Sequence, residues 1–201
     1  MRIGSRWSGA CGVAALLVLA LVGSLGCAPI WSPTAKGPGP HPLASIQITA
    51  SGLDDWGWAS YEALGGVWHF TRQGDELNQV WMRRWPKSQV VKGTNRSIRD
   101  DMTLQEIAAL SLDSRRLDDG VARLEVVSNE PARVGNRDCY RIDYRHRNDI
   151  GLLKRTVEYG CPVGTWMYRF EYMAPAQYYF DAYLREFEAF VRSVAFKVPG
   201  A

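Results

Sequence analysis

The sequence has few of the residues from which catalytic and metal sites are commonly built. It contains four cysteines and three histidines among 201 residues. His41, His69 and His146 are far apart, neither an HExxH nor a CxxC spacing occurs, and no glycine-rich phosphate loop follows an expected strand. These absences argue against the common metal-dependent and nucleotide-dependent enzymes, and we expect no metal site and no cofactor.

The sequence also has no apolar run long enough to cross a bilayer as a helix, which takes roughly 20 residues. Its one unbroken apolar run extends from Cys11 to Val22, behind Arg2 and Arg6. Basic residues ahead of such a run keep the N-terminus cytoplasmic. The pattern is typical of a secretory signal peptide.

The end of this stretch, Ser24-Leu25-Gly26-Cys27, resembles the lipobox of bacterial lipoproteins. It departs from the family pattern at Ser24, where leucine is commoner. The resemblance implies that residues 1–26 are removed and that Cys27 is lipidated and becomes the mature N-terminus. Several acyl chains anchor a protein stably. The alternatives are a plain secretory signal, with Cys27 an ordinary thiol, and a retained membrane helix.

The same resemblance implies a location. In a cell with two membranes, Ala28 after the lipidated cysteine suits export to the outer membrane, because the residue that commonly signals retention is aspartate. We therefore expect a protein of the cell envelope, held by Cys27 on the periplasmic side of the outer membrane.

Little net charge remains after the first stretch. The whole chain carries +3, and losing Arg2 and Arg6 leaves +1. No broad electrostatic attraction to nucleic acid is expected. Residues 27–45 contain five of the ten prolines, which excludes helix and sheet ladder and predicts an extended tether. Residues 46–198 are long enough to fold as one α+β domain.

The order of predicted elements is strands, a helix, a meander of strands, and a long C-terminal helix. Strands are expected at Ser45–Thr49, Val67–Thr71, Glu76–Arg84, Val121–Val127, Arg137–His146, Leu152–Cys161, Thr165–Tyr172 and Val194–Val198, and helices at Leu104–Arg115 and Pro175–Ser193. Asp54–Leu64 is expected to be a short helical or irregular segment, Lys87–Arg99 a loop, and Pro131 and Gly135 the bounds of another loop.

Two local signals support this assignment. Thr103 and Glu106 have the spacing of a capping box at a helix start. Tyr140, Ile142 and Tyr144 alternate with charged residues, as in a sheet with one packed and one wetter face. The pattern predicts an α+β protein with a mostly antiparallel sheet and helices packed against it.

This element order, ending in the sequence FEAFVRSVAF, resembles the Mog1/PsbP-like fold over roughly Asp54 to Lys197. The resemblance implies an α/β/α sandwich. It also implies a role as an accessory or binding protein, as for most members of that fold. The resemblance rests on the element order and the terminal helix. Because no diagnostic residue supports it, no functional residue is carried over.

Cys139 and Cys161 present a conflict of strand register. Outside the cytoplasm an even pair of cysteines is most simply a disulfide, the alternative being two buried thiols. Pairing Tyr140 with Tyr159 gathers the apolar residues on one face but places Cys139 opposite Gly160. We expect the apolar face to set the register, with a disulfide made possible by an irregularity near Gly160.

One stretch is a candidate binding surface. Trp81, Arg83, Arg84 and Trp85 place aromatic rings beside guanidinium groups, which suits stacking and contacts with anions or sugars. The alternative is a strand with Trp81 or Met82 in the core and solvated arginines.

Three functions are consistent with these sequence features. The favoured one is a non-catalytic envelope lipoprotein that binds a partner protein or ligand. The second is a carrier of lipid or another hydrophobic ligand, which predicts a deep apolar cavity. The third is an envelope hydrolase that uses Cys139 with a histidine, or one of the carboxylate pairs Asp54-Asp55, Asp100-Asp101 and Asp118-Asp119.

Overall fold

The computed structural model describes residues 32–33, 41–43, 46–61 and 67–197. The predicted signal peptide, Cys27 and most of the predicted tether lie outside them. Both described parts of the predicted tether, Ser32–Pro33 and His41–Leu43, pair as short strands, so the expectation that its prolines exclude a sheet ladder is wrong there. The elements in chain order are β1 Ser32–Pro33, β2 His41–Leu43, β3 Ile48–Ala50, β4 Gly57–Tyr61, β5 Val67–Thr71, β6 Gln79–Pro86, β7 Val90–Val91, β8 Arg96–Ser97, α2 Leu104–Arg116, β9 Ala122–Val134, β10 Arg137–Arg147, β11 Leu153–Val163, β12 Trp166–Pro175, α3 Tyr179–Ser193 and β13 Ala195–Phe196.

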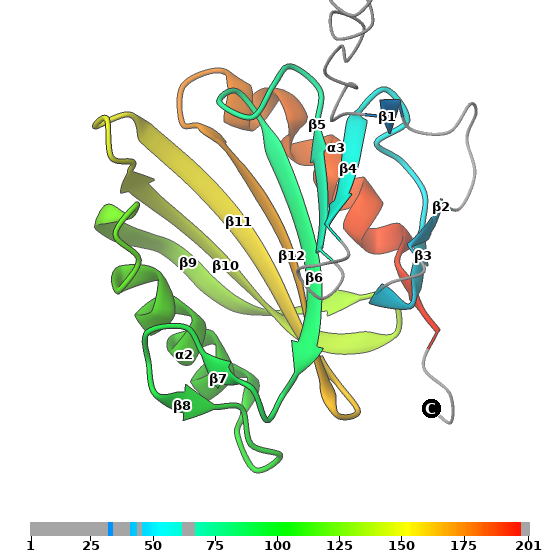
Figure 1. The fold of residues 1–201 in the computed structure, drawn as a ribbon, viewed down its shortest axis with the longest axis vertical. Coiled ribbons are helices and arrows are strands. Elements are labelled where there is room, and N and C mark those ends of the chain that lie inside the picture. Colours follow the sequence, from blue (N-terminus) through cyan, green and yellow to red (C-terminus); the bar gives the residue numbers. More distant parts are fainter. Residues whose placement is uncertain (1–31, 34–40, 44–45, 62–66, 198–201) are drawn as a thin grey trace, which may run out of the picture. The chain divides into compact units, whose positions relative to one another are not determined.

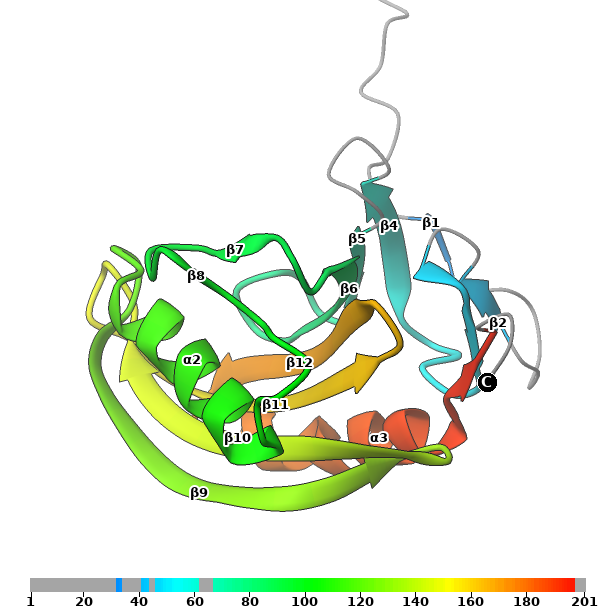
Figure 2. The same cartoon turned by 90° about the horizontal axis from the view of Figure 1, so that it is seen from below.

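The centre of the domain is an eight-stranded sheet with the order β1-β4-β5-β6-β12-β11-β10-β9. Each neighbouring pair in it is antiparallel. The helix α2 lies on one face of the sheet and α3 on the other (Figures 1 and 2). The predicted α+β class, with a mostly antiparallel sheet between helices, is confirmed.

The start of α2 and the packing of α3 follow from the sequence. At α2, the Thr103 hydroxyl accepts the Glu106 amide at 3.2 Å, and the Glu106 carboxylate accepts the Thr103 amide at 2.7 Å. This is the predicted capping box. In α3, Phe180, Phe187 and Phe190 recur at helical spacing and are buried against the sheet.

Each face of the sheet has its own core, which corrects the expectation of one wetter face. On the α3 side, helical phenylalanines pack with a set from β5, β6, β11 and β12 that includes Phe70, Val80, Met82, Val157, Tyr168, Phe170 and Tyr172. On the α2 side, Ile107, Ala108, Leu110 and Leu112 pack with Tyr140, Ile142, Tyr144 and Met167. A sheet covered on both faces buries both sets of alternating side chains.

Several predicted elements are wrong in type or extent. Gly57–Tyr61, within the segment predicted to be helical or irregular, forms strand β4, and residues 62–66 lie outside the description. The predicted loop Lys87–Arg99 contains the small hairpin β7–β8. Pairing with neighbouring strands outweighs weak local preference in such short segments.

Two predictions that were based on prolines are wrong, because both prolines lie in strands. Pro131 lies inside β9 and does not bound a loop. Because β9 is an edge strand, a residue without an N–H group is tolerated there. Pro175 ends β12 and does not start a helix, so α3 begins later, at Tyr179. The preceding Tyr178 has a φ of +64°.

Cys139 and Cys161 form a disulfide between β10 and β11. The two strands pair with Tyr140 opposite Gly160 and Ile142 opposite Glu158, so the register predicted from the apolar residues is wrong. The prediction failed because it assumed one packed face. The expected irregularity near Gly160 is also wrong: the register shifts lie between β9 and β10, near Tyr144 and Arg147. Figure 2 shows β9 following a long curve at that edge.

Gly160 has a different role from the one predicted. A Cβ atom at this position would lie 2.1 Å from Cζ of Tyr140, whose ring is buried over the glycine. We expect Gly160→Ala to lower the free energy of unfolding by about 1–3 kcal/mol, because the packed ring has to move. Urea unfolding measures the change. Gly120→Ala is the control, since its Cβ meets only an Asp118 oxygen at 3.7 Å. Equal stabilities of the two variants would contradict this account.

Candidate functional site: a basic cavity beside helix α2

A cavity of about 580 Å³ lies between the sheet surface of β5, β6 and β12, the end of α2, and β7. We call it the basic cavity. Its charged lining is Arg83, Arg84, Lys92, Arg115, Arg169 and Asp118, and its apolar lining includes Val67, Trp85, Val91 and Trp166. Five cations and one carboxylate border it, so its walls favour an anionic group.

Because side chains alternate along β6, the four predicted binding residues do not all lie on the same face of the sheet. Arg83 lies on the α2 side of the sheet, directly opposite Arg169 of β12, while Arg84 lies opposite Tyr168, on the α3 side. The Arg84 guanidinium carbon stands 4.1 Å from the centre of the Trp166 ring, at the border of the basic cavity. Arg83, Arg84 and Trp85 all line the cavity.

Trp81, the fourth predicted residue, lies deeper in the sheet. Its ring stacks on that of His69 with centroids 3.6 Å apart. Burial lowers the pKa of His69 to about 4, so this imidazole is neutral at pH 7. Met82, between Trp81 and Arg83, is in the core on the α3 side. The structure thus combines the two alternatives: one part of the stretch is core, and another part lines a cavity.

Two arginines of the cavity lining, Arg115 and Arg169, belong to a buried charge network that the sequence analysis missed. Arg115 of α2 contacts Glu158 at 3.2 Å and also contacts Glu171. Arg169 lies 3.8 Å from Glu158 and 3.6 Å from Glu171. Only 1% of the Glu158 side chain and 6% of the Glu171 side chain are exposed. Buried carboxylates of this kind require paired cations and hydrogen bonds.

Glu158 is also held by two hydroxyl groups. Ser111 of α2 donates to its Oε1 at 2.5 Å, and the phenol of Tyr140 donates to the same oxygen at 2.7 Å. Burial raises the pKa of the Tyr140 phenol well above its usual value, which keeps it a donor. The sequence carried no signal for this role, because a glutamate between Val157 and Tyr159 fits the wetter face of an alternating strand. Its partners come from α2 and β10.

A second, smaller cavity of about 190 Å³ continues along α2 and shares Arg115 and Asp118 with the first. His146 and Tyr144 are part of its wall. Only 4% of His146 is exposed, and burial lowers its pKa, so it is neutral at pH 7. Arg115 therefore stands between two adjacent cavities.

The other candidate groups from the sequence do not converge on a site. Cys139 and Cys161 are bonded to each other, so neither is a free thiol. The aspartate pairs are separate: Asp100 pairs with Lys87, Asp101 with Arg99, and Asp118 with Lys92. Within residues 46–61 and 67–197, no three His, Cys, Asp or Glu side chains gather to hold a metal ion.

Solved structures with this arrangement of sheet and helices are known. Cyanobacterial PsbP (CyanoP) from Synechocystis sp. PCC 6803 matches with a TM-score of 0.58 and 11% identity, over 86% of this chain and 98% of that one. The Ran-binding protein Mog1p of Saccharomyces cerevisiae matches with a TM-score of 0.51 and 7% identity, over 81% of this chain and 96% of that one. The fold is that of the Mog1/PsbP-like proteins.

The Mog1/PsbP-like fold also occurs within a longer chain. A Bacteroides thetaiotaomicron protein matches with a TM-score of 0.50 and 12% identity over 82% of this chain. This chain spans about half, 49%, of the length of that protein. No family model matches the sequence, and no curated protein matches it. At sequence identities of 7% to 12%, the likeness to the solved structures establishes the fold alone. The chemistry of the site depends on the residues of this chain.

Proposed function

We propose that this protein is a lipid-anchored envelope protein with a non-catalytic binding role, and that the basic cavity is its binding site. The observation that carries the proposal is the cavity itself, a 580 Å³ concavity with convergent polar groups and aromatic rings. The lipobox-like end of the first stretch, with Cys27, supports the anchor. Ala28 supports placement on the periplasmic side of the outer membrane.

The alternative functions are less consistent with the site. A thiol hydrolase needs a free cysteine, and Cys139 is in a disulfide. A carrier of a wholly hydrophobic ligand needs an apolar cavity, whereas arginines dominate the charged lining of this one. In the described residues, no helix has the length and apolar character needed to cross a membrane. We propose the lipid on Cys27 as the membrane contact and an envelope protein as a partner.

The anchor is tested by metabolic labelling with an alkyne analogue of palmitate in a bacterial host. We expect label on the wild-type protein and on Cys11→Ser, the matched control, because Cys11 lies in the part that is removed. We expect no label on Cys27→Ser and its release from the membrane fraction, since no acyl chain then holds it. Label on Cys27→Ser would refute the lipobox interpretation.

The binding role is tested on protein extracted from the envelope in mild detergent. Native mass spectrometry is expected to show a non-covalently bound small molecule, and that molecule is expected to be recovered chemically unchanged after incubation with fresh protein. Conversion of the molecule would point instead to an enzyme.

A further inference from the structure

The arrangement of three arginines in the basic cavity contains an unbalanced positive charge. Arg83 and Arg169 lie directly opposite each other on neighbouring strands, and Arg115 approaches from α2. Like charges opposite each other on two strands repel and destabilise the pair. Such an arrangement persists when negative charge compensates for it.

The two buried glutamates compensate for only two of the three cations. Glu158 and Glu171 each contact Arg115 and Arg169. Among the residues that the structure describes, no carboxylate lies within ion-pair distance of Arg83. One of these three arginines is therefore left without a carboxylate, and it is Arg83. Of the other two lining cations, Lys92 pairs with Asp118, and Arg84 lies over the Trp166 ring. Arg83 is thus the guanidinium group of the α2 side that is left to bind a ligand.

Arg83 is also held in an environment that disfavours an isolated charge. Its side chain is half-buried, and burial lowers the pKa of its guanidinium, an effect that the more distant Glu171 and Glu158 oppose only in part. Bringing an anion into contact with it offsets this cost, because the attraction between opposite charges grows as water is excluded. Arginine suits this task, since its planar group donates two parallel hydrogen bonds to a phosphate or carboxylate.

An aromatic ring lies next to this cation. The guanidinium carbons of Arg83 and Arg169 stand 5.9 and 5.4 Å from the centre of the Trp85 ring. Val67 and Val91 are also part of the cavity wall. A charged centre bordered by an aromatic ring and branched aliphatic side chains suits a ligand with an anionic end and an apolar body.

We propose that the basic cavity binds an amphiphilic organic anion, with a phosphate or carboxylate group on Arg83 and the apolar part against Trp85 and Val91. This inference rests on the proposed function, because it assumes that the cavity is the binding site. It adds the charge of the ligand and the residue that selects it.

Three probes with the same alkyl chain test the proposal by calorimetry, each below its micelle concentration: octyl phosphate, octanoate and octyl glucoside. The protein is the full mature chain with Cys27→Ser. We expect at least one anion to bind roughly tenfold or more tightly than the neutral glucoside. Added salt is expected to weaken binding of the two anions and to leave binding of the glucoside unchanged, because salt screens charge.

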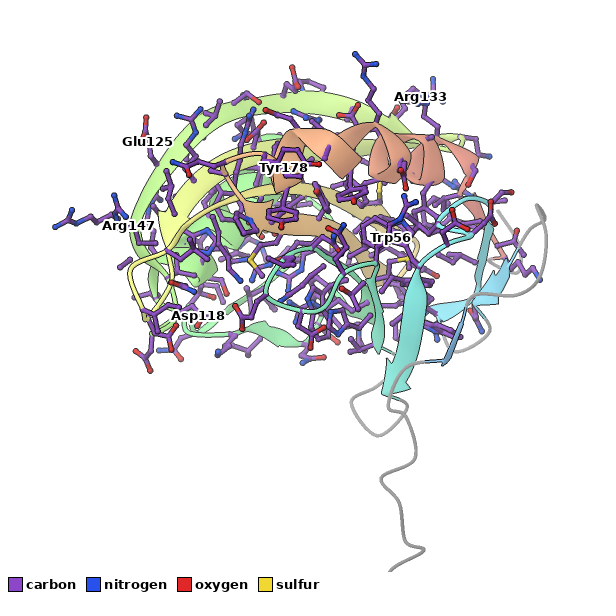
Figure 3. All side chains as sticks on the ribbon, turned by 90° about the horizontal axis from the view of Figure 1, so that it is seen from above. Trp56, Asp118, Glu125, Arg133, Arg147 and Tyr178 are labelled. Carbon is purple, nitrogen blue, oxygen red and sulfur yellow. A yellow bond between two sulfur atoms is a disulfide. The ribbon has the colours of Figure 1, made fainter. Side chains whose placement is uncertain are left out.

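Two variants identify the contact. Arg83→Gln is expected to weaken binding of the preferred anion roughly tenfold to a hundredfold, the loss typical of a charge-assisted hydrogen bond. The control Arg133→Gln removes the same charge from β9, where Arg133 projects from the surface with 68% of its side chain exposed (Figure 3). It is expected to bind like the wild type. Thermal unfolding of both variants checks that they are folded.

The outcomes separate the two proposals. If the glucoside binds as tightly as the anions, or if Arg83→Gln keeps the preference for anions, the inference about charge is wrong while the cavity remains a binding site. If none of the three probes binds and the protein from the envelope also carries no small molecule, the proposed function fails and the inference fails with it.

Discussion

Replacing Arg115 with methionine is expected to lower the free energy of unfolding by about 3–5 kcal/mol. The substitution removes the cation that contacts both Glu158 and Glu171. Both carboxylates stay buried, and among the described residues Arg169 is then the one cation at ion-pair distance from them, at 3.8 and 3.6 Å. Leaving a buried charge without a close partner costs several kcal/mol, far more than loss of an exposed ion pair. Urea unfolding followed by circular dichroism measures the difference.

The next residue of the helix provides the control. Arg116 pairs with Asp113 at 3.2 Å, and about half of each side chain is exposed. Arg116→Met is therefore expected to cost less than about 1 kcal/mol. Combining Arg115→Met with Glu171→Gln is expected to recover part of the loss, because one carboxylate is removed with its cation while Glu158 keeps Arg169 and the hydroxyl groups of Ser111 and Tyr140. If Arg115→Met were no less stable than Arg116→Met, the network would not stabilise the fold.

Removing the disulfide is expected to cost about 3 kcal/mol of unfolding free energy. Cys139 and Cys161 are separated by 22 residues in sequence, and closing a loop of that length restricts the unfolded chain by roughly this amount. The double variant Cys139→Ala, Cys161→Ala is compared with the parent protein by urea unfolding. Both carry Cys27→Ser, so that no other thiol of the mature chain takes part.

A reducing agent provides the matched comparison for the disulfide. It is expected to lower the stability of the parent protein to that of the double variant and to leave the double variant unchanged. Unchanged stability of the reduced parent would contradict a stabilising disulfide. The bond links β10 to β11 on the α3 side, and neither cysteine lines the basic cavity. We therefore expect binding by the cavity to survive its loss under conditions where the protein is folded.

Arg115 links stability to binding. It is part of the buried network and also of the wall of the basic cavity. The side chains that hold α2 on the sheet therefore also set the charge of the site. For this reason Arg83, which has no ion-pair partner among the described residues, is the better probe of ligand binding, and Arg115 is the better probe of folding.

The sequence by itself determined the local features and the class of fold. The capping box of Thr103 and Glu106 fixed the start of α2, because its hydrogen bonds involve residues three positions apart. The connection between the antiparallel strands β5 and β6 contains Gly74, whose φ of +100° favours glycine, and so it likewise depends on local backbone chemistry. Alternation in β10 and the aromatic stripe of α3 then predicted a sheet with helices packed on it, and the structure has this arrangement.

Only the tertiary structure decided the strand register and the site. The apolar pattern of β10 and β11 favours one packed face, but α2 and α3 cover both faces, and a buried glutamate is then tolerated opposite Ile142. The basic cavity combines β6, β12 and the end of α2, which are far apart in sequence. Its charge balance depends on which arginines meet Glu158 and Glu171 in space. A long-range pairing of this kind leaves no periodic signal in the chain, because it is set by the packing of α2 across the sheet.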